Sequence, residues 1–414
     1  SGKFRLTSLE RNWILYDVGN SAFVLMVATL IPIFFNALAA AGGLSSVEYL
    51  AYWGYASSAV TIITAVLSPI LGTVADTKGF KKPIFILCVF VGIVGCCAMG
   101  AVSAWLPFLV IFVIAKVGFS GSLVFYDSML SDVTTPERMD EVSSRGYAWG
   151  YIGSCVPFVV CLGLVLGAGS IGISQMTALN LALLLTAAWW LLTTLPLLKS
   201  YKQLYYVEVE KHAVRQSFAR IGHTLRHLPE DKQVFWFLLA FFCYIDGVYT
   251  IIDMATAYGT ALGLDTTGLL LALLVTQIVA FPSALVFGRL SNKYPSAKLI
   301  PVCIAAYAGI AVFAFFLTRQ WQFWVLAVIV GMFQGGVQAL SRSHFAKIIP
   351  PEKSGEYFGL FDICGKGASF LGTMIVSVGS QLTGSANVGV GSLIVLFIVG
   401  FVLFRVSCRQ SETA

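Results

Sequence analysis

The sequence predicts an all-α integral membrane protein with twelve transmembrane helices in two pseudo-symmetric bundles of six. Three observations predict this fold: apolar stretches of about 20 residues recur along the chain, charged residues make up only 11% of it, and basic residues are concentrated in alternate loops. An apolar helix of about 20 residues crosses the roughly 30 Å hydrocarbon layer of a bilayer. The net charge of +6 follows from this loop bias and does not indicate nucleic-acid binding.

Short polar loops bound each span in turn. Basic residues precede the first span and follow the second, fourth, sixth, eighth, tenth and twelfth, whereas Arg319 is alone on the other side. An even number of spans and this bias place both termini in the cytoplasm. The predicted spans are 12–38, 49–73, 83–104, 106–131, 144–168, 174–198, 233–262, 266–290, 299–318, 321–346, 357–382 and 388–407.

The longest loop divides the chain into three parts. These are an N-terminal six-helix bundle (12–198), a cytoplasmic linker (199–232) and a C-terminal six-helix bundle (233–407). In the linker, Val214, Phe218, Ile221 and Leu225 recur at 4-3-4 spacing, which predicts an amphipathic helix on the inner membrane surface.

The two halves repeat each other weakly. Gly72 and Asp76 after the second span correspond to Gly288 and Asn292 after the eighth, and Lys82 corresponds to Lys298. Duplicated halves related by a pseudo-two-fold axis are typical of secondary transporters.

The loop after the second span resembles the G-x-x-x-D-x-x-G-x-[RK]-[RK] signature of the major facilitator superfamily. Its positions are occupied by Gly72, Asp76, Gly79, Lys81 and Lys82. A glycine at position 72 allows close helix approach, and Asp76 can sit against a helix N-terminus and a basic side chain. The resemblance implies an inner gating loop formed by Gly72, Asp76, Gly79 and Lys82, together with Arg342 of the tenth span. The partner of Asp76 stays open, because the fourth span ends in acids where a basic residue is common.

The first span resembles a subfamily. Trp13-Ile14-Leu15-Tyr16-Asp17, followed by Asn20-Ser21-Ala22-Phe23, is similar to the start of the Unknown Major Facilitator family. That family includes bacterial proteins of mostly unassigned substrate and fungal vacuolar amino-acid effluxers. The resemblance implies solute transport and a central cavity lined by spans 1, 4, 7 and 10.

Charged and polar residues within the spans are the candidate substrate and coupling residues. Charges inside a bilayer are costly unless they pair or work. The candidates are Asp17, Asn20, Lys116, Asp246, Asp253 and Gln334, with Trp149, Phe333, Asp362 and Lys366 in support. For Asp17 and for the Asp362–Lys366 pair, which lies four residues apart on one face, a purely structural role is the alternative.

These residues predict a proton-coupled secondary transporter that works by alternating access. Asp246 or Asp253 would take up a proton as its burial and its distance from Lys116 change. A lysine and acids in one cavity suit a zwitterionic solute such as an amino acid. The alternatives are a cation or drug exporter, an amphiphile exporter, or a non-transporting nutrient sensor, and sodium is the alternative coupling ion.

Other function classes lack their signatures in the sequence. No phosphate-binding G-x-x-x-x-G-K-[ST] motif occurs, and the four histidines are not placed for catalysis. We therefore expect no enzyme activity, catalytic residue, metal site or cofactor. We expect a monomer in a bacterial inner membrane, with a small-molecule solute, a proton and the lipid bilayer as partners.

Overall fold

In the computed structural model, which describes residues 3–209, 211–261 and 263–412, twelve helical segments are long and apolar enough to cross a membrane. Side chains 256–258, 261, 368–370 and 386 lie outside the description. The first half contains α1 (Ser8–Ala28), α2 (Leu30–Ala41), α3 (Ser46–Ala75), α4 (Lys81–Ala101), α5 (Trp105–Ser128), α6 (Leu130–Val133), α7 (Met139–Leu166) and α8 (Gln175–Ser200). Helices α1 and α2 together form the first span.

The linker and the second half follow in the same way. The linker contains α9 (Ala213–His227) and a short 3-10 turn, η1 (Leu228–Glu230). The second half contains α10 (Lys232–Ala261), α11 (Thr266–Leu290), α12 (Ser296–Phe315), α13 (Gln320–Ile348), η2 (Pro351–Lys353), α14 (Ser354–Thr383), α15 (Ala386–Gly391) and α16 (Ile394–Glu412). The twelve-helix fold class predicted from the sequence is confirmed, whereas the exact domain boundaries stay a prediction.

Several spans begin earlier than hydropathy alone predicts. The first two spans start at Ser8 (α1) and Ser46 (α3) instead of 12 and 49, because Thr7 and Ser45 each form a capping box with a glutamate three residues later. Such polar caps satisfy free N–H groups of the first turn. Hydropathy does not detect a polar first turn, so the predicted spans begin too late at these two ends.

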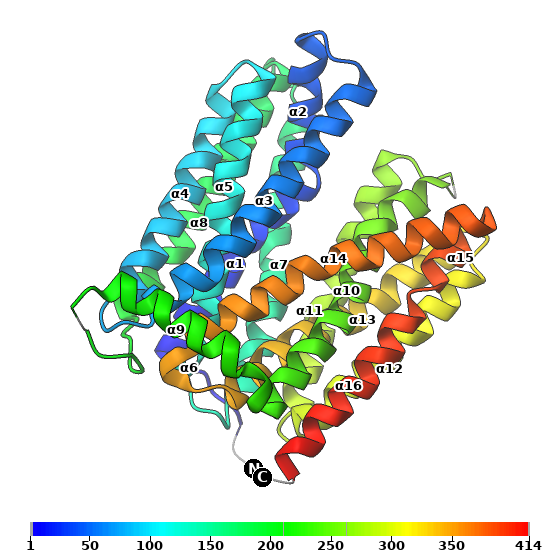
Figure 1. Cartoon of the computed structure of the whole chain (residues 1–414). Coiled ribbons are helices and arrows are strands. Elements are labelled where there is room, and N and C mark those ends of the chain that lie inside the picture. Colours follow the sequence, from blue (N-terminus) through cyan, green and yellow to red (C-terminus); the bar gives the residue numbers. More distant parts are fainter. Residues whose placement is uncertain (1–2, 210, 262, 413–414) are drawn as a thin grey trace.

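The two halves meet through reciprocal helix pairs. Helix α3 packs against α14, and α7 packs against α11. These are the second and fifth spans of one half against the fifth and second of the other, as a pseudo-two-fold axis requires. Figure 1 shows the halves converging where both termini lie and diverging at the opposite end. We call these the closed end and the open end.

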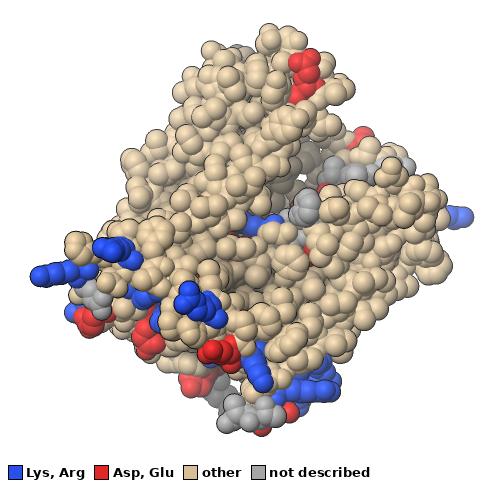
Figure 2. All heavy atoms as spheres, in the orientation of Figure 1, with Lys and Arg blue, Asp and Glu red and all other residues tan. Residues whose placement is uncertain are grey.

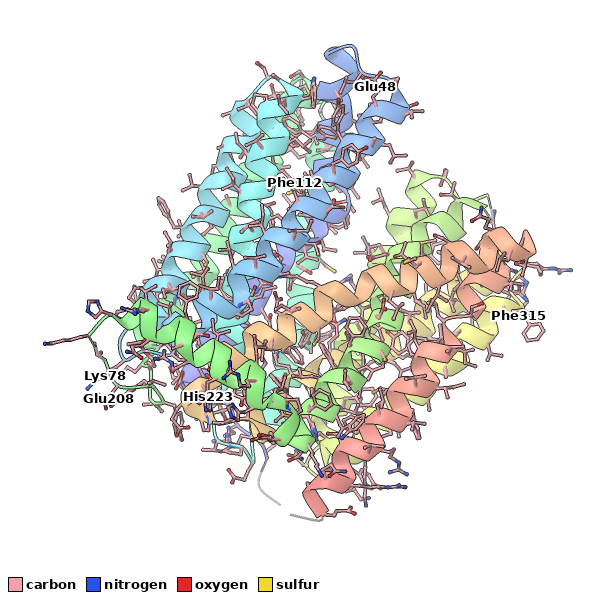
Figure 3. All side chains as sticks on the ribbon, in the orientation of Figure 1. Glu48, Lys78, Phe112, Glu208, His223 and Phe315 are labelled. Atoms are coloured by element: carbon pink, nitrogen blue, oxygen red, sulfur yellow. The ribbon has the colours of Figure 1, made fainter. Side chains whose placement is uncertain are left out.

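The open end leads into a hollow between the halves. In the space-filling view the molecule is hollowed between the two bundles, and atoms of charged residues are visible inside (Figure 2). The side-chain view places Lys78, Glu208 and His223 near the closed end and Glu48 at the open end (Figure 3).

Candidate functional site

The carboxylate of Asp76 links the two halves at the closed end. Asp76 follows the last residue of α3 and accepts hydrogen bonds from the backbone N–H groups of Gly355 (2.7 Å) and Glu356 (2.9 Å). Both donors lie in the first turn of α14, where free N–H groups and the helix dipole favour a negative charge. Burial raises the pKa of Asp76 to about 7, although Lys81 and the two N–H donors act to lower it.

Lys81 is the basic partner of this carboxylate. Its side chain is 0% exposed, and its ammonium lies 3.7 Å from Asp76 and 3.9 Å from Asp132. The same nitrogen donates a hydrogen bond to Ser354 Oγ across the halves (2.8 Å). Lys82, the motif lysine selected from the sequence, is half-buried and forms no ion pair within the described residues.

The glycines of this loop have distinct structural tasks. A Cβ atom at Gly72 would collide with the backbone carbonyl of Gly355, so α3 and α14 can approach this closely only without a side chain there. Gly79 has a φ of +81°, in the left-handed region that glycine adopts without strain. The close packing places Asp76 within reach of α14.

The corresponding loop of the second half makes a different contact. Asn292 donates a hydrogen bond to Glu141 Oε2 (2.7 Å), and Glu141 also pairs with Arg145 (3.0 Å). A further ion pair joins the halves nearby, between Lys347 and Asp140 (2.8 Å). In this loop the first turn of α7 supplies acidic acceptors, whereas in the loop after α3 the first turn of α14 supplies N–H donors.

Arg342 forms the central contact between the halves. Its guanidinium comes from α13 and contacts the carboxylates of Asp17 (3.4 Å) and Asp127 (3.1 Å), from α1 and α5. It also donates to the hydroxyl (2.9 Å) and the carbonyl (3.0 Å) of Ser143 on α7. The rings of Trp13 and Tyr147 lie 4.7 and 4.4 Å from the guanidinium carbon, a cation–π arrangement.

A second group of charges lies nearer to the open end. Asp253 is exposed, and Lys116 is half-buried with its ammonium 4.5 Å from the Phe119 ring centre. Lys116 interacts electrostatically with Asp253 and with Lys366. Lys366 pairs with Asp362 (2.9 Å). Charges from α5, α10 and α14 therefore lie within electrostatic range of one another.

Three other predicted residues are buried between helices. Asp246 is 0% exposed and accepts hydrogen bonds from the backbone N–H of Gly372 (2.9 Å) and from Thr250 (3.3 Å). Asn20 donates to the carbonyl of Tyr16 one turn earlier (2.9 Å). The amide oxygen of Gln334 is buried without a hydrogen-bond partner among the described residues.

The two aromatic candidates, one on α7 and one on α13, both pack against α11. Trp149 packs edge-on against Phe281, with ring centres 5.1 Å apart, and Phe333 packs edge-on against Phe287 at 6.0 Å. Both contacts belong to the packing of α7 and α13 onto α11.

Sequence reasoning omitted several residues that complete these clusters. Ser143, Tyr147 and Glu141 contact the other half or its arginine, yet a serine, a tyrosine and a first-turn acid are common at the start of any helix. The only local signal was the density of polar residues at the start of α7.

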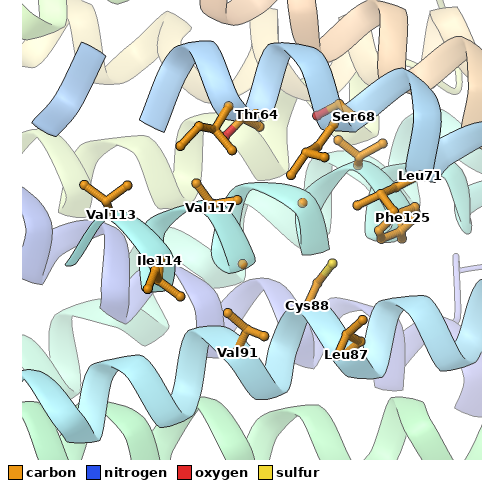
Figure 4. Close-up of a pocket in the computed structure, with 15 residues that line it drawn as sticks. Thr64, Ser68, Leu71, Leu87, Cys88, Val91, Val113, Ile114, Val117 and Phe125 are labelled. Carbon is orange, nitrogen blue, oxygen red and sulfur yellow. The ribbon is translucent and has the colours of Figure 1, made fainter. Parts of the chain in front are cut away.

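An apolar pocket lies between α3, α4 and α5 (Figure 4). Its volume is about 240 Å³, and its lining includes Leu67, Leu87, Val117 and Phe125. Ser68 lies on its wall and donates a hydrogen bond to Asp362 (3.0 Å). The pocket thus adjoins the charged group near the open end.

Comparison with known proteins identifies relatives along the full chain. The family model described as "Vacuole effluxer Atg22 like" matches residues 8–413. The uncharacterized MFS-type transporter YxiO of Bacillus subtilis (strain 168) is 41% identical over 414 residues, covering 99% of this chain and 97% of that protein. Autophagy-related protein 22 of Coccidioides immitis (strain RS) is 25% identical over 315 residues, 65% of this chain. The match covers 51% of that fungal relative's length.

Solved structures share the fold at low sequence identity. The human organic anion transporter MFSD10 (TETRAN) superposes with a TM-score of 0.74 at 14% identity, covering 95% of this chain and 99% of that one. The major facilitator superfamily transporter FucP, in its outward conformation, superposes with a TM-score of 0.72 at 16% identity, covering 97% of each chain.

Proposed function

Since this chain belongs to the Atg22-like vacuole effluxer family, and is thus a multi-pass membrane transporter of the major facilitator superfamily and not an enzyme, we propose that it carries a small zwitterionic solute by proton-coupled alternating access. An amino acid fits this class. The membrane is the bacterial inner membrane, with both termini in the cytoplasm. In that orientation the open end faces outward, and the chain works as a monomer.

The observation that carries the proposal is the mixed group of charges near the open end. Lys116 supplies a cation for a carboxylate, and Asp253 supplies an anion for an ammonium group. The Asp362–Lys366 pair offers a second set of both charges. A zwitterion that bridges Lys116 and Asp253 would pair with both charges at once through charge-assisted hydrogen bonds.

The closed end supports the alternating-access part of the proposal. Three contacts join one half to the other there: Asp76 with the first turn of α14, Glu141 with Asn292, and Arg342 with Asp17. Inward opening must break these contacts while the hollow at the other end closes. Discrete, paired contacts of this kind can exist in two alternative arrangements.

Asp253 is the acid we assign to proton uptake. It is exposed at the open end and interacts with Lys116, so movement of either helix changes its charge environment. Asp246, the other acid predicted from the sequence, is buried between α10 and α14. The backbone N–H of Gly372 and the hydroxyl of Thr250 donate hydrogen bonds to it. We assign Asp246 to helix packing.

Flux into proteoliposomes tests the proposal. With an inward proton gradient and a pool of labelled amino acids, we expect uptake that a protonophore abolishes. Loss of a hydrogen bond to a charged group corresponds to about tenfold to hundredfold weaker binding, so K116Q and D253N are expected to lose uptake to that extent. K298Q and E137Q serve as controls, because they remove one positive and one negative charge at exposed positions away from the hollow. Proton-independent flux, or equal flux in all four variants, would contradict the proposal.

A second candidate is an amphiphile exporter. The apolar pocket between α3, α4 and α5 adjoins Asp362 through Ser68, so an apolar tail and a charged head could occupy the two sites together. Competition by a zwitterionic detergent, but not by amino acids, would favour this candidate.

A further inference from the structure

The linker that joins the halves is hydrogen-bonded to the loop between α3 and α4 (76–80), which we call the first gating loop. The backbone of Val207 donates to the carbonyl of Asp76 (2.8 Å) and accepts from the N–H of Lys78 (2.9 Å). Asp132, the second carboxylate beside Lys81, accepts from Tyr201 and from the N–H groups of Leu204 and Tyr205 (2.6–3.1 Å). Residues 201–207 are therefore part of the same contact set as Asp76 and Lys81.

Helix α9 continues this attachment with its polar face inward. Ser217 and Thr224 are 1% and 6% exposed. Arg220 donates to the carbonyl of Thr73 (3.0 Å) and to Thr77 (3.5 Å), at the end of α3 where the span leaves the membrane. The helix thus lies against the gating loop at the level of the bilayer surface.

Three of the four residues in the apolar stripe of α9 are exposed, and the fourth, Ile221, is half-buried. Val214, Phe218 and Leu225 are 54%, 52% and 51% exposed. A helix on a water-soluble surface buries its apolar stripe against the protein, whereas α9 buries its serine and threonine instead. Beside a membrane span, this reversed orientation leaves the acyl region of the lipid as the cover of the stripe.

Basic side chains flank the stripe on its other side. Arg215 and Arg226 lie on the side of the helix away from Ser217 and Thr224, and both are exposed. A shallow depression next to the stripe is lined by Phe80, Val214 and Phe218 and includes Arg215. An apolar floor with a guanidinium matches a phospholipid that has an acyl chain and an anionic headgroup.

We propose that α9 is a docking surface for anionic phospholipid and that lipid bound there holds the linker and the first gating loop in the closed arrangement. The protein side of this link is the chain of bonds from α9 through Arg220 to Thr73 and Thr77, and from Val207 to Asp76. The name "gating loop" rests on the proposed transport cycle, whereas the lipid contact itself does not.

Hydrogen–deuterium exchange of the full chain in nanodiscs tests the docking surface without requiring a substrate. Nanodiscs of phosphatidylcholine are compared with nanodiscs that also contain phosphatidylglycerol, following peptides that cover 76–80, 201–207 and 213–227. We expect slower exchange of all three with phosphatidylglycerol. Equal exchange in the two lipids would overturn the proposal.

Variants separate the headgroup, the acyl contact and the coupling. Each basic residue near an anionic surface contributes a factor of about five to binding, so R215Q is expected to reduce the lipid effect about fivefold, and F218S is expected to remove it. K293Q removes a positive charge at the same end but from the second half, and is expected to keep the full lipid effect. If R215Q behaves like K293Q, the docking surface is wrong.

R220Q tests the link to the gating loop. This substitution leaves the outer face of α9 intact, so peptide 213–227 should stay protected by phosphatidylglycerol. Peptide 76–80 should lose part of its lipid dependence, because the Val207 bonds to Asp76 and Lys78 remain. An unchanged lipid response of 76–80 in R220Q would overturn the coupling through this arginine. A failed flux experiment with an intact lipid response would refute the transport proposal alone.

Discussion

The loops that follow α3 and α11 occupy corresponding places in the two halves, yet they hold the closed end by different means. In the first loop, a buried carboxylate, Asp76, meets two N–H groups of α14 and a buried lysine. In the second, the amide of Asn292 meets Glu141. The first contact combines charge, burial and a helix dipole, whereas the second is a single charge-assisted hydrogen bond. The two halves therefore share the position of the contact but not its chemistry.

The helix packing beneath the loops differs in the same direction. A Cβ atom at Gly72 would overlap the carbonyl of Gly355, whereas one at Gly288 would meet the Cβ of Ser144 at 3.0 Å. A side-chain carbon can yield by a few tenths of an ångström more easily than a backbone carbonyl. The α3–α14 contact is therefore the tighter of the two, and we expect the closed end to be more sensitive to changes there.

The largest difference is expected between D76A and N292A. Removing Asp76 leaves the buried Lys81 with Asp132 as its remaining carboxylate and leaves two N–H groups of α14 without their acceptor, a loss of about 3–5 kcal/mol. N292A leaves Glu141 paired with Arg145 and should cost about 1.5–3 kcal/mol at most. Thermal unfolding in detergent measures both. Equal losses would show that the two loops contribute alike.

The next effect is expected at the glycines. G72A should destabilise the protein by about 1–3 kcal/mol because the added methyl group forces α3 and α14 apart. G288A should cost less, since Ser144 can shift. The same unfolding measurement, together with flux, provides the comparison. A G288A variant less stable than G72A would reverse the asymmetry inferred from the packing.

Proton binding should also distinguish the two loops. The pKa of Asp76 is about 7 in the closed arrangement, and we expect it to return toward its ordinary value of 3.8 when opening exposes the carboxyl group to water. The closed arrangement then binds the proton more tightly. As the pH falls from about 7 to about 4, the ratio of closed to open molecules should rise by up to about tenfold per pH unit.

This pH dependence can be followed by labelling of a cysteine placed at the closed end. D76N should abolish it, and N292A should leave it unchanged, because Asn292 does not titrate. A pH response that persists in D76N would assign the proton to another group.

The smallest effect is expected at Lys82. This lysine is half-buried and forms no ion pair within the described residues, so K82Q should change the unfolding free energy by no more than about 0.5 kcal/mol. The matched variant K81Q removes the buried partner of two carboxylates and should approach the loss seen in D76A. If the two variants are equally harmful, the loop uses both lysines.

Several features were readable from local patterns. Twelve apolar stretches predict twelve spans because a bilayer requires continuous helical hydrogen bonding over its full thickness. The spacing of Gly72, Asp76 and Gly79 predicts the loop, and the 4-3-4 stripe predicts the helix now seen at Ala213–His227. Each of these depends only on neighbouring residues, so the sequence by itself was sufficient.

Tertiary structure alone decided which residues meet. Asp17 and Arg342 are 325 positions apart, and neither residue's surroundings in the sequence specify the other. Lys81 and Lys82 are chemically identical, and only the direction of each side chain from the start of α4 decides that Lys81 is buried. The same holds for α9: the stripe indicates an amphipathic helix, but only its packing against α3, with Ser217 and Thr224 buried, decides that most of the stripe stays exposed.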